Sequence, residues 1–282
     1  MKTRWKILVL LGAMVLLSAC EGRSDTLPEP SSGPVSAAPE EQARLTCRLV
    51  DGAEDGSLLL AGLDGDAGVY RLGVGEVPVT VDGQAAAAGD LADGMEVTVV
   101  FDGMVQESYP GGFYEVYALE AVTPLDGSYT DLCGFYLAVL DDLWQVDEGL
   151  NGETVAIDLS QAPGELTQAE QAAIAWRFGE LHGVRALTAT FEELLADGMV
   201  TAEPLEEHDP DGPAFYQWKE GSLLAITSHE TGETEAYSLP VLRFDAQKWA
   251  SSLGAYHFYD CTAVWPERGT WTDYCVGSEM VS

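Results

Sequence analysis

Aspartate–glycine pairs divide the chain between residues 44 and 123 into short runs, and their spacing limits what this stretch can fold into. They include pairs that begin at residues 51, 55, 64, 82 and 102. Each favours a tight chain reversal, because glycine adopts a positive φ without steric cost. Apolar residues stand at every second position from Met95 to Phe101, with the polar Glu96 and Thr98 between the first three and Asp102 after the last, which is typical of a half-buried strand. Residues 44–123 are therefore predicted to form an all-β domain, a small OB-like barrel.

The N-terminal residues carry the pattern of a bacterial export signal. Lys2, Arg4 and Lys6 precede an apolar run over residues 7–17, which is too short to span a bilayer. Leu17-Ser18-Ala19-Cys20 follows and resembles the lipobox, in which the cysteine thiol takes a diacylglycerol. The alternative is an ordinary secretion signal with a chance cysteine. We expect residues 1–19 to be a removed signal peptide and Cys20 to carry palmitate-type acyl chains that hold the chain on the extracellular side of the cell membrane.

The segment after Cys20 and the overall charge restrict the class of partner. Residues 20–43 are rich in Pro, Ser, Glu and Ala and are predicted to be a flexible linker. The net charge is −34, and it becomes −37 without Lys2, Arg4 and Lys6. A field of that sign repels nucleic acid and favours a cationic or neutral ligand, including a glycan. The alternative is that the acids serve solubility alone.

Residues 124–282 change character and predict an α+β domain. An apolar stripe with helical spacing runs from residue 129 to 146. Thr167-x-x-Glu170 and Thr190-x-x-Glu193 are capping boxes that would each open a helix, the first extending to about residue 182. After Pro213 the pattern changes to strands separated by turn residues. Helices followed by an antiparallel sheet are therefore expected.

Both halves contain motifs that resemble those of lipoproteins from Gram-positive bacteria. In the first half the motif is Asp90-Leu91-x-x-Gly94-Met95-x-Val97-x-Val99, followed by Asp102-Gly103 and Glu107-Ser108-Tyr109-Pro110. It is similar to a family of small OB-like domains of unknown function. In the second half Asp131-Leu132-Cys133-Gly134-x-Tyr136-Leu137 and the Gly277-Ser278-Glu279 terminus are similar to uncharacterised lipoprotein segments. The resemblance implies a fold and a location, and no chemistry.

The sequence contains no complete catalytic, cofactor or metal motif. Ser252-Leu253-Gly254 lacks the first glycine of a nucleophile elbow, because Ala250 stands there. The four histidines are far apart and lack metal-ligand spacing. Asp209-x-Asp211 with Glu220 has partial EF-hand spacing, but Ala214 occupies the glycine position. We therefore predict no catalytic, cofactor or metal residue.

Aromatic residues gather in the last part of the chain and permit two interpretations. Trp218, Trp249, Trp265 and Trp271 could hold a sugar or a cationic peptide through their ring faces. The alternative, which we favour, is that they pack helices onto the sheet.

Two cysteines near the C-terminus are predicted to meet across a hairpin. With residues 267–269 as its loop, Trp265 faces Trp271 and Cys261 faces Cys275. Directly opposed cysteines are close enough for a disulfide, which is permitted outside the cytoplasm. A Cys261–Cys275 bridge, or close contact, is therefore expected. A slip of one residue would turn the two cysteines to opposite faces.

These features predict a membrane-anchored extracellular lipoprotein with a non-catalytic binding or accessory role. The alternatives are an extracellular hydrolase that uses carboxylates of the second domain on a glycan or peptide, and a sensor or spacer without a small ligand. A concave pocket with two or more polar groups of perturbed pKa would favour an enzyme. A flat, aromatic-rich patch would favour binding.

Overall fold

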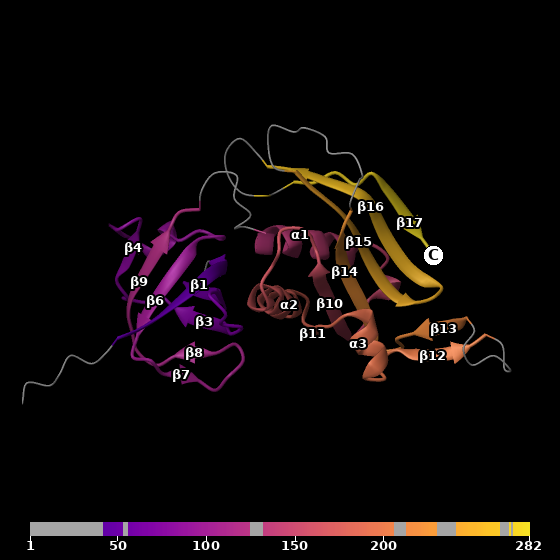
Figure 1. Ribbon diagram of the computed structural model, residues 1–282, viewed down its shortest axis with the longest axis horizontal. Helices are drawn as coiled ribbons and strands as arrows, with labels where there is room; N and C mark the ends of the chain where they lie inside the picture. The colour runs from indigo at the N-terminus through magenta and orange to yellow at the C-terminus, as the bar shows by residue number, and fades with distance from the viewer. Residues whose placement is uncertain are drawn as a thin grey trace, which may run out of the picture. The chain divides into compact units, whose positions relative to one another are not determined.

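The computed structural model describes residues 42–52, 56–124, 132–205, 213–229, 241–265, 271 and 273–282. This described part of the chain is mostly β, with 48% strand and 20% helix, and its strands form two large sheets and a two-stranded ribbon (Figure 1). Among these described residues, none of the helices combines the length and apolar character needed to span a bilayer. The predicted signal peptide, Cys20 and most of the linker lie outside the described residues.

The first sheet has seven strands in the order β3-β2-β1-β6-β9-β4-β5. All neighbours are antiparallel except β4 and β9, which are parallel. The predicted turn at Asp82-Gly83 is confirmed, since both residues have positive φ, of 50° and 75°. The bounds are β1 Ala43–Gly52, β2 Ser57–Gly62, β3 Val69–Gly73, β4 Val79–Val81, β5 Gln84–Ala86, β6 Glu96–Phe101 and β9 Val116–Val122, with β7 Val105–Gln106 and β8 Gly112–Phe113 forming the separate ribbon.

This first sheet encloses one apolar core without closing on itself. The core contains Cys47, Leu60, Val99 and Leu119, all with no exposed surface. Strands β3 and β5 are the two ends of the hydrogen-bonded order, and no closed barrel is found among the described strands.

The second sheet is mixed, which corrects the expectation of an antiparallel sheet. Strand β10 pairs in parallel with both β11 and β14, whereas the other pairs are antiparallel. Strands β10 and β11 are parallel because α2 lies between them in the chain. This helix returns the chain to the end of the sheet at which β10 began, so that β11 runs in the same direction. The strands are β10 Thr154–Gln161, β11 Arg185–Thr188, β12 Thr201–Pro204, β13 Ala214–Gln217, β14 Gly221–Ser228, β15 Val241–Ser251, β16 Gly254–Val264 and β17 Ser278–Val281, and the helices are α1 Leu132–Gln145, α2 Gln168–His182 and α3 Phe191–Ala196.

The two predicted capping boxes are confirmed. The Thr167 hydroxyl accepts the Glu170 N–H at 3.2 Å, and the Thr167 N–H donates to the Glu170 carboxylate at 2.8 Å. Thr190 and Glu193 make the same pair of contacts at the start of α3. Helix α2 ends at Gly183, whose φ of 65° suits glycine.

Helices α1 and α2 share one apolar core with the second sheet (Figure 1). Its fully buried aromatic residues include Phe135, Tyr136, Phe178 and Phe244. The same core contains Val50, Leu59, Ala61 and Val69 of the first sheet. Helix α3 and Trp218 belong to a separate small core with Ala156 of β10 and Leu223 of β14. The predicted domain boundary between residues 123 and 124 stays a prediction.

A buried lysine caps the C-terminal end of α1. Lys248 on β15 has no exposed surface, and its ammonium group donates to the carbonyls of Trp144, Val146 and Asp147 and to Oδ1 of Asn151. These carbonyls lie at the end of α1, where the helix has no partner for them and the helix dipole is negative. Burial lowers the pKa of Lys248 to about 8. One cation therefore joins β15 to the end of the helix.

We predict that Lys248→Met lowers the free energy of unfolding by about 2–4 kcal/mol, because it removes the four hydrogen bonds that the ammonium group donates to the Trp144, Val146 and Asp147 carbonyls and to Oδ1 of Asn151. Urea unfolding followed by tryptophan fluorescence measures the change. Lys219→Met, at an exposed lysine, is the matched control and should change stability by less than about 0.5 kcal/mol. Equal stability of the two variants would contradict the role assigned to Lys248.

The same lysine predicts a pH dependence. Because its folded pKa of about 8 lies below the ordinary 10.5, the unfolded chain binds more protons at this group between those pH values. The contribution of Lys248 to the free energy of unfolding should therefore rise with pH across that window. Urea unfolding of the wild type and of Lys248→Met at pH 7.5 and pH 9.5 tests this sign. A difference between the two proteins that shrinks on going to pH 9.5 would be inconsistent with it.

Candidate functional site

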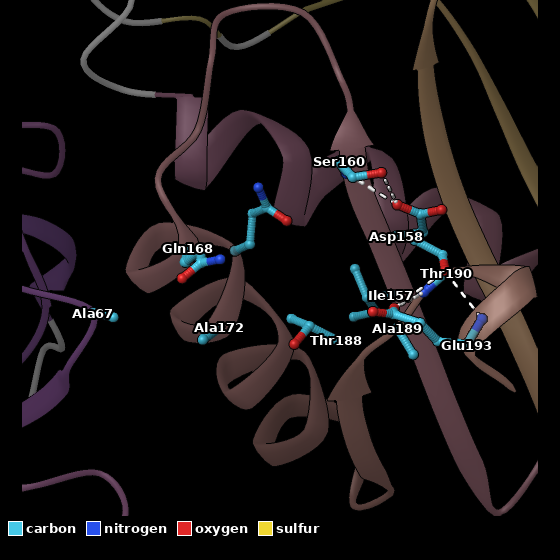
Figure 2. A pocket seen from close by; sticks show the side chains of 11 residues that line it. Ala67, Ile157, Asp158, Ser160, Gln168, Ala172, Thr188, Ala189, Thr190 and Glu193 are labelled. Atoms are coloured by element: carbon cyan, nitrogen blue, oxygen red, sulfur yellow. Dashed lines mark hydrogen bonds between the residues drawn. The ribbon is translucent and has the colours of Figure 1, made fainter. Parts of the chain in front are cut away.

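A polar pocket of about 440 Å³ lies at the carboxyl ends of the parallel strands β10 and β11 (Figure 2). Crevices at this edge of a parallel sheet are common ligand sites, because the chain leaves the sheet there through loops and helix starts. Strand β10, the start of α2 and the start of α3 supply most of its walls. The lining residues are Ala67, Ile157, Asp158, Ser160, Gln168, Gln171, Ala172, Thr188, Ala189, Thr190 and Glu193.

The two carboxylates of this pocket are each held by a near neighbour in the sequence. Oδ1 of Asp158 accepts the backbone N–H and the hydroxyl of Ser160, at 3.0 and 2.7 Å. Oε2 of Glu193 accepts the N–H and the hydroxyl of Thr190, at 2.9 and 3.1 Å. These hydrogen bonds from Thr190 lower the pKa of Glu193, since they stabilise the ionised form. Glu193 therefore contributes a negative charge to the pocket at neutral pH.

The remaining lining groups are uncharged donors and acceptors. Gln168 and Ala172 lie on α2, and Figure 2 shows them on one side of the pocket with Asp158 and Glu193 on the other. Hydroxyls of Ser160 and Thr188 add further hydrogen-bonding groups. Such a lining accepts hydrogen bonds from hydroxyl or ammonium groups and disfavours anions. It therefore suits a neutral polyol or a cationic ligand.

The four tryptophans proposed as ligand contacts are mostly core residues. Trp218, Trp265 and Trp271 are 7%, 6% and 2% exposed. Trp249 is half-buried, and its ring meets that of Phe191 edge to face with centroids 5.2 Å apart. The packing interpretation is the one that fits these side chains, because a buried ring has no free face for a sugar.

The strand pairing near the C-terminus is one residue away from the predicted register. Cys275 pairs with Thr262, through two backbone hydrogen bonds of 2.9 Å, and not with Cys261. Cys261 is buried, Cys275 is exposed, and both are free thiols. The predicted register is therefore wrong by one residue. Trp265 and Trp271 still meet edge to face with centroids 5.2 Å apart.

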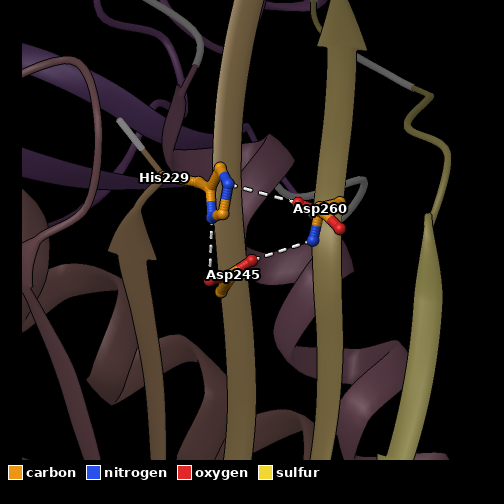
Figure 3. A group of neighbouring side chains, drawn as sticks. All are labelled: His229, Asp245 and Asp260. Atoms are coloured by element: carbon orange, nitrogen blue, oxygen red, sulfur yellow. Dashed lines mark hydrogen bonds and ion pairs between the residues drawn. The ribbon is translucent and has the colours of Figure 1, made fainter. Parts of the chain in front are cut away.

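A second polar group forms on the second sheet, away from the pocket lining (Figure 3). Nδ1 of His229 lies 3.1 Å from Oδ2 of Asp245, and its Nε2 lies 3.2 Å from Oδ1 of Asp260. The backbone N–H of Asp260 donates to Oδ1 of Asp245 at 2.8 Å. A histidine that the sequence analysis treated as isolated thus has a carboxylate at each ring nitrogen.

Sequence reasoning found some of these residues but not the sites that they form. Thr190 and Glu193 were recognised as a capping box, whereas their place beside Asp158 depends on the parallel pairing of β10 and β11. One signal for this pairing was available in the sequence. A strand, a helix that begins after Thr167 and a second strand follow one another, and this order indicates a crossover connection between parallel strands. No signal joined His229 to its two aspartates, because strand register alone brings them together. His208, Asp209 and Asp211 lie outside the described residues.

Comparison of the chain with protein-family models, curated proteins and solved structures found no match.

Proposed function

We propose that this chain is an extracellular lipoprotein, anchored to the cell membrane through Cys20, that binds a neutral or cationic ligand without transforming it. The observation that carries the binding role is the acidic, hydroxyl-rich pocket at the carboxyl ends of β10 and β11. A glycan or a basic peptide has the matching hydrogen-bond donors. The net charge of −34 favours the same ligands.

The state of Glu193 supports binding over the alternative of a hydrolase that uses this carboxylate as its acid. A glycosidase needs one carboxylic acid whose pKa is raised, so that it can protonate the leaving group. The pKa of Glu193 is instead lowered by Thr190. Glu193 also belongs to the capping box of α3, which ties its orientation to the helix start. An acid held in this way is suited to electrostatic contact with a ligand.

The proposed location and the finer fold rest on the sequence pattern. The apolar run after Lys2, Arg4 and Lys6, followed directly by Cys20, supports the lipid anchor. For the first half we retain the OB-like interpretation in a partly open form, since many short strands surround a single core. A backbone bridge joins Tyr70 of β3 to Gly111, the residue before β8. The second half is proposed as an α+β domain with a mixed sheet.

We predict that Cys20→Ala moves the protein from the membrane fraction to the soluble fraction of cells that express it, because the thiol that carries the acyl chains is lost. Immunoblotting of both fractions, together with metabolic labelling by a palmitate analogue, gives the result. Cys275→Ser changes an exposed cysteine that lies far along the chain and should leave the protein membrane-bound and labelled. Membrane association of Cys20→Ala at the wild-type level would refute the anchor.

For the pocket, we predict that Asp158→Asn combined with Glu193→Gln weakens binding of tetralysine by at least about tenfold, since a hydrogen bond to a charged group contributes about 1.5–3 kcal/mol. Glutamine preserves the capping geometry of α3. Isothermal titration of the protein with tetralysine and with chitotetraose measures the affinity for a cationic and a neutral ligand.

Asp64→Asn combined with Glu96→Gln, at two exposed acids outside the pocket, controls for the loss of two negative charges and should bind as the wild type does. Mass spectrometry of the recovered ligand distinguishes binding from hydrolysis. Cleaved chitotetraose or tetralysine would favour the hydrolase, and unchanged affinity of the double variant would exclude this pocket as the binding site.

A further inference from the structure

The second sheet brings three metal-ligating side chains together on adjoining strands. His229 directly follows β14, Asp245 lies on β15 and Asp260 on β16. One ligand atom from each residue can be chosen so that all three lie within 4.8 Å of one another. Figure 3 shows the imidazole ring between the two carboxylates. Bonds from zinc to nitrogen or oxygen are about 2.0–2.2 Å long, so donor atoms at this separation need only small side-chain rotations to contact one ion.

Strand register builds this arrangement. Phe244 pairs with Cys261 and Ala246 with Phe258, so that Asp245 alone stands opposite two residues of β16. This is a β-bulge, and bulges redirect the side chain of the extra residue. The extra residues include Asp260, whose φ is 54°. Its N–H holds Oδ1 of Asp245 at 2.8 Å and leaves the other oxygen, Oδ2, facing His229.

The backbone also positions the imidazole. The N–H of His229 donates to the carbonyl of Arg243 at 3.0 Å, which extends the β14–β15 pairing by one residue. The side chain of His229 is partly exposed, at 34%, and that of Asp260 is more so, at 64%. An ion can therefore reach the group from solvent, while backbone contacts keep the donors in place.

We propose that His229, Asp245 and Asp260 form a binding site for a divalent transition-metal ion of the zinc class. One imidazole nitrogen and two carboxylates supply three ligands, and water can take the remaining position. The two carboxylates balance the charge of the ion. Binding replaces the present contacts of His229 with the two aspartates by bonds to the ion from one ring nitrogen and from both carboxylates.

The competing explanation is an imidazolium ion that bridges the two aspartates without metal. The two explanations differ in their dependence on added zinc and on the two carboxylates. A metal site binds zinc and loses affinity when either aspartate is changed to asparagine. A bridge without metal gives no zinc-dependent signal at any pH.

Calorimetric titration of the full chain with ZnCl₂ at pH 7.5 tests the proposal. We expect one equivalent to bind to the wild type, and Asp245→Asn and Asp260→Asn each to weaken binding by about tenfold or more. Asp64→Asn is the matched control, because Asp64 is exposed and has a φ of 55°, close to the 54° of Asp260. Asparagine adopts this conformation readily, so both variants should fold, and Asp64→Asn should bind zinc as the wild type does.

A further variant separates the site from other sources of zinc binding. Cys275→Ser removes an exposed thiol and should leave the affinity unchanged. No binding by the wild type, equal binding by all aspartate variants, or loss of binding in Cys275→Ser would each overturn the proposal. None of the three ligands lines the pocket, so tetralysine binding and zinc binding can fail independently.

Discussion

The contact between Lys248 and the end of α1 organises the second half of the chain. A buried ammonium group is costly unless every donor is satisfied. Here it donates to three carbonyls at the end of α1 and to Oδ1 of Asn151. The last carbonyls of a helix have no N–H partner within the helix. Strand β15 is thereby tied to α1. Side chains on a strand alternate between faces, so Phe244 and Lys248, which are buried, face the helices, while Asp245 faces away. The position of β15 thus sets both the core and the His229 group.

Helix capping and ligand binding use the same residues in the pocket. The hydrogen bonds between Thr190 and Glu193 begin α3 and also keep the Glu193 carboxylate ionised. A residue with this structural duty is poorly suited to trade a proton during catalysis, because the neutral acid would lose the hydrogen bonds that position it. The same arrangement presents a fixed negative charge to a ligand. The fold therefore favours recognition over proton transfer at this place.

The sequence predicted individual elements better than the relations between them. Both capping boxes mark helix starts because their contacts span only three residues, and local contacts follow from local sequence. The sheet type was predicted incorrectly, since the apolar pattern of β10 does not say which neighbour it takes. The cysteine register was wrong by one residue for a related reason. Trp265 and Trp271 meet although Cys275 pairs with Thr262, so the expected contact between these rings did not identify the register.

What the sequence determined by itself is the export and anchoring pattern around Cys20, the acidic character of the chain, the short strands of its first half and the starts of α2 and α3. These depend on composition or on residues within one turn of each other. Only the tertiary structure decided that Asp158 lies beside Glu193 in a pocket, that Lys248 closes α1, and that His229 stands between Asp245 and Asp260. Each of these relations joins residues from different strands or helices, and a shift of one residue in strand register would abolish it, because neighbouring side chains on a strand point to opposite faces.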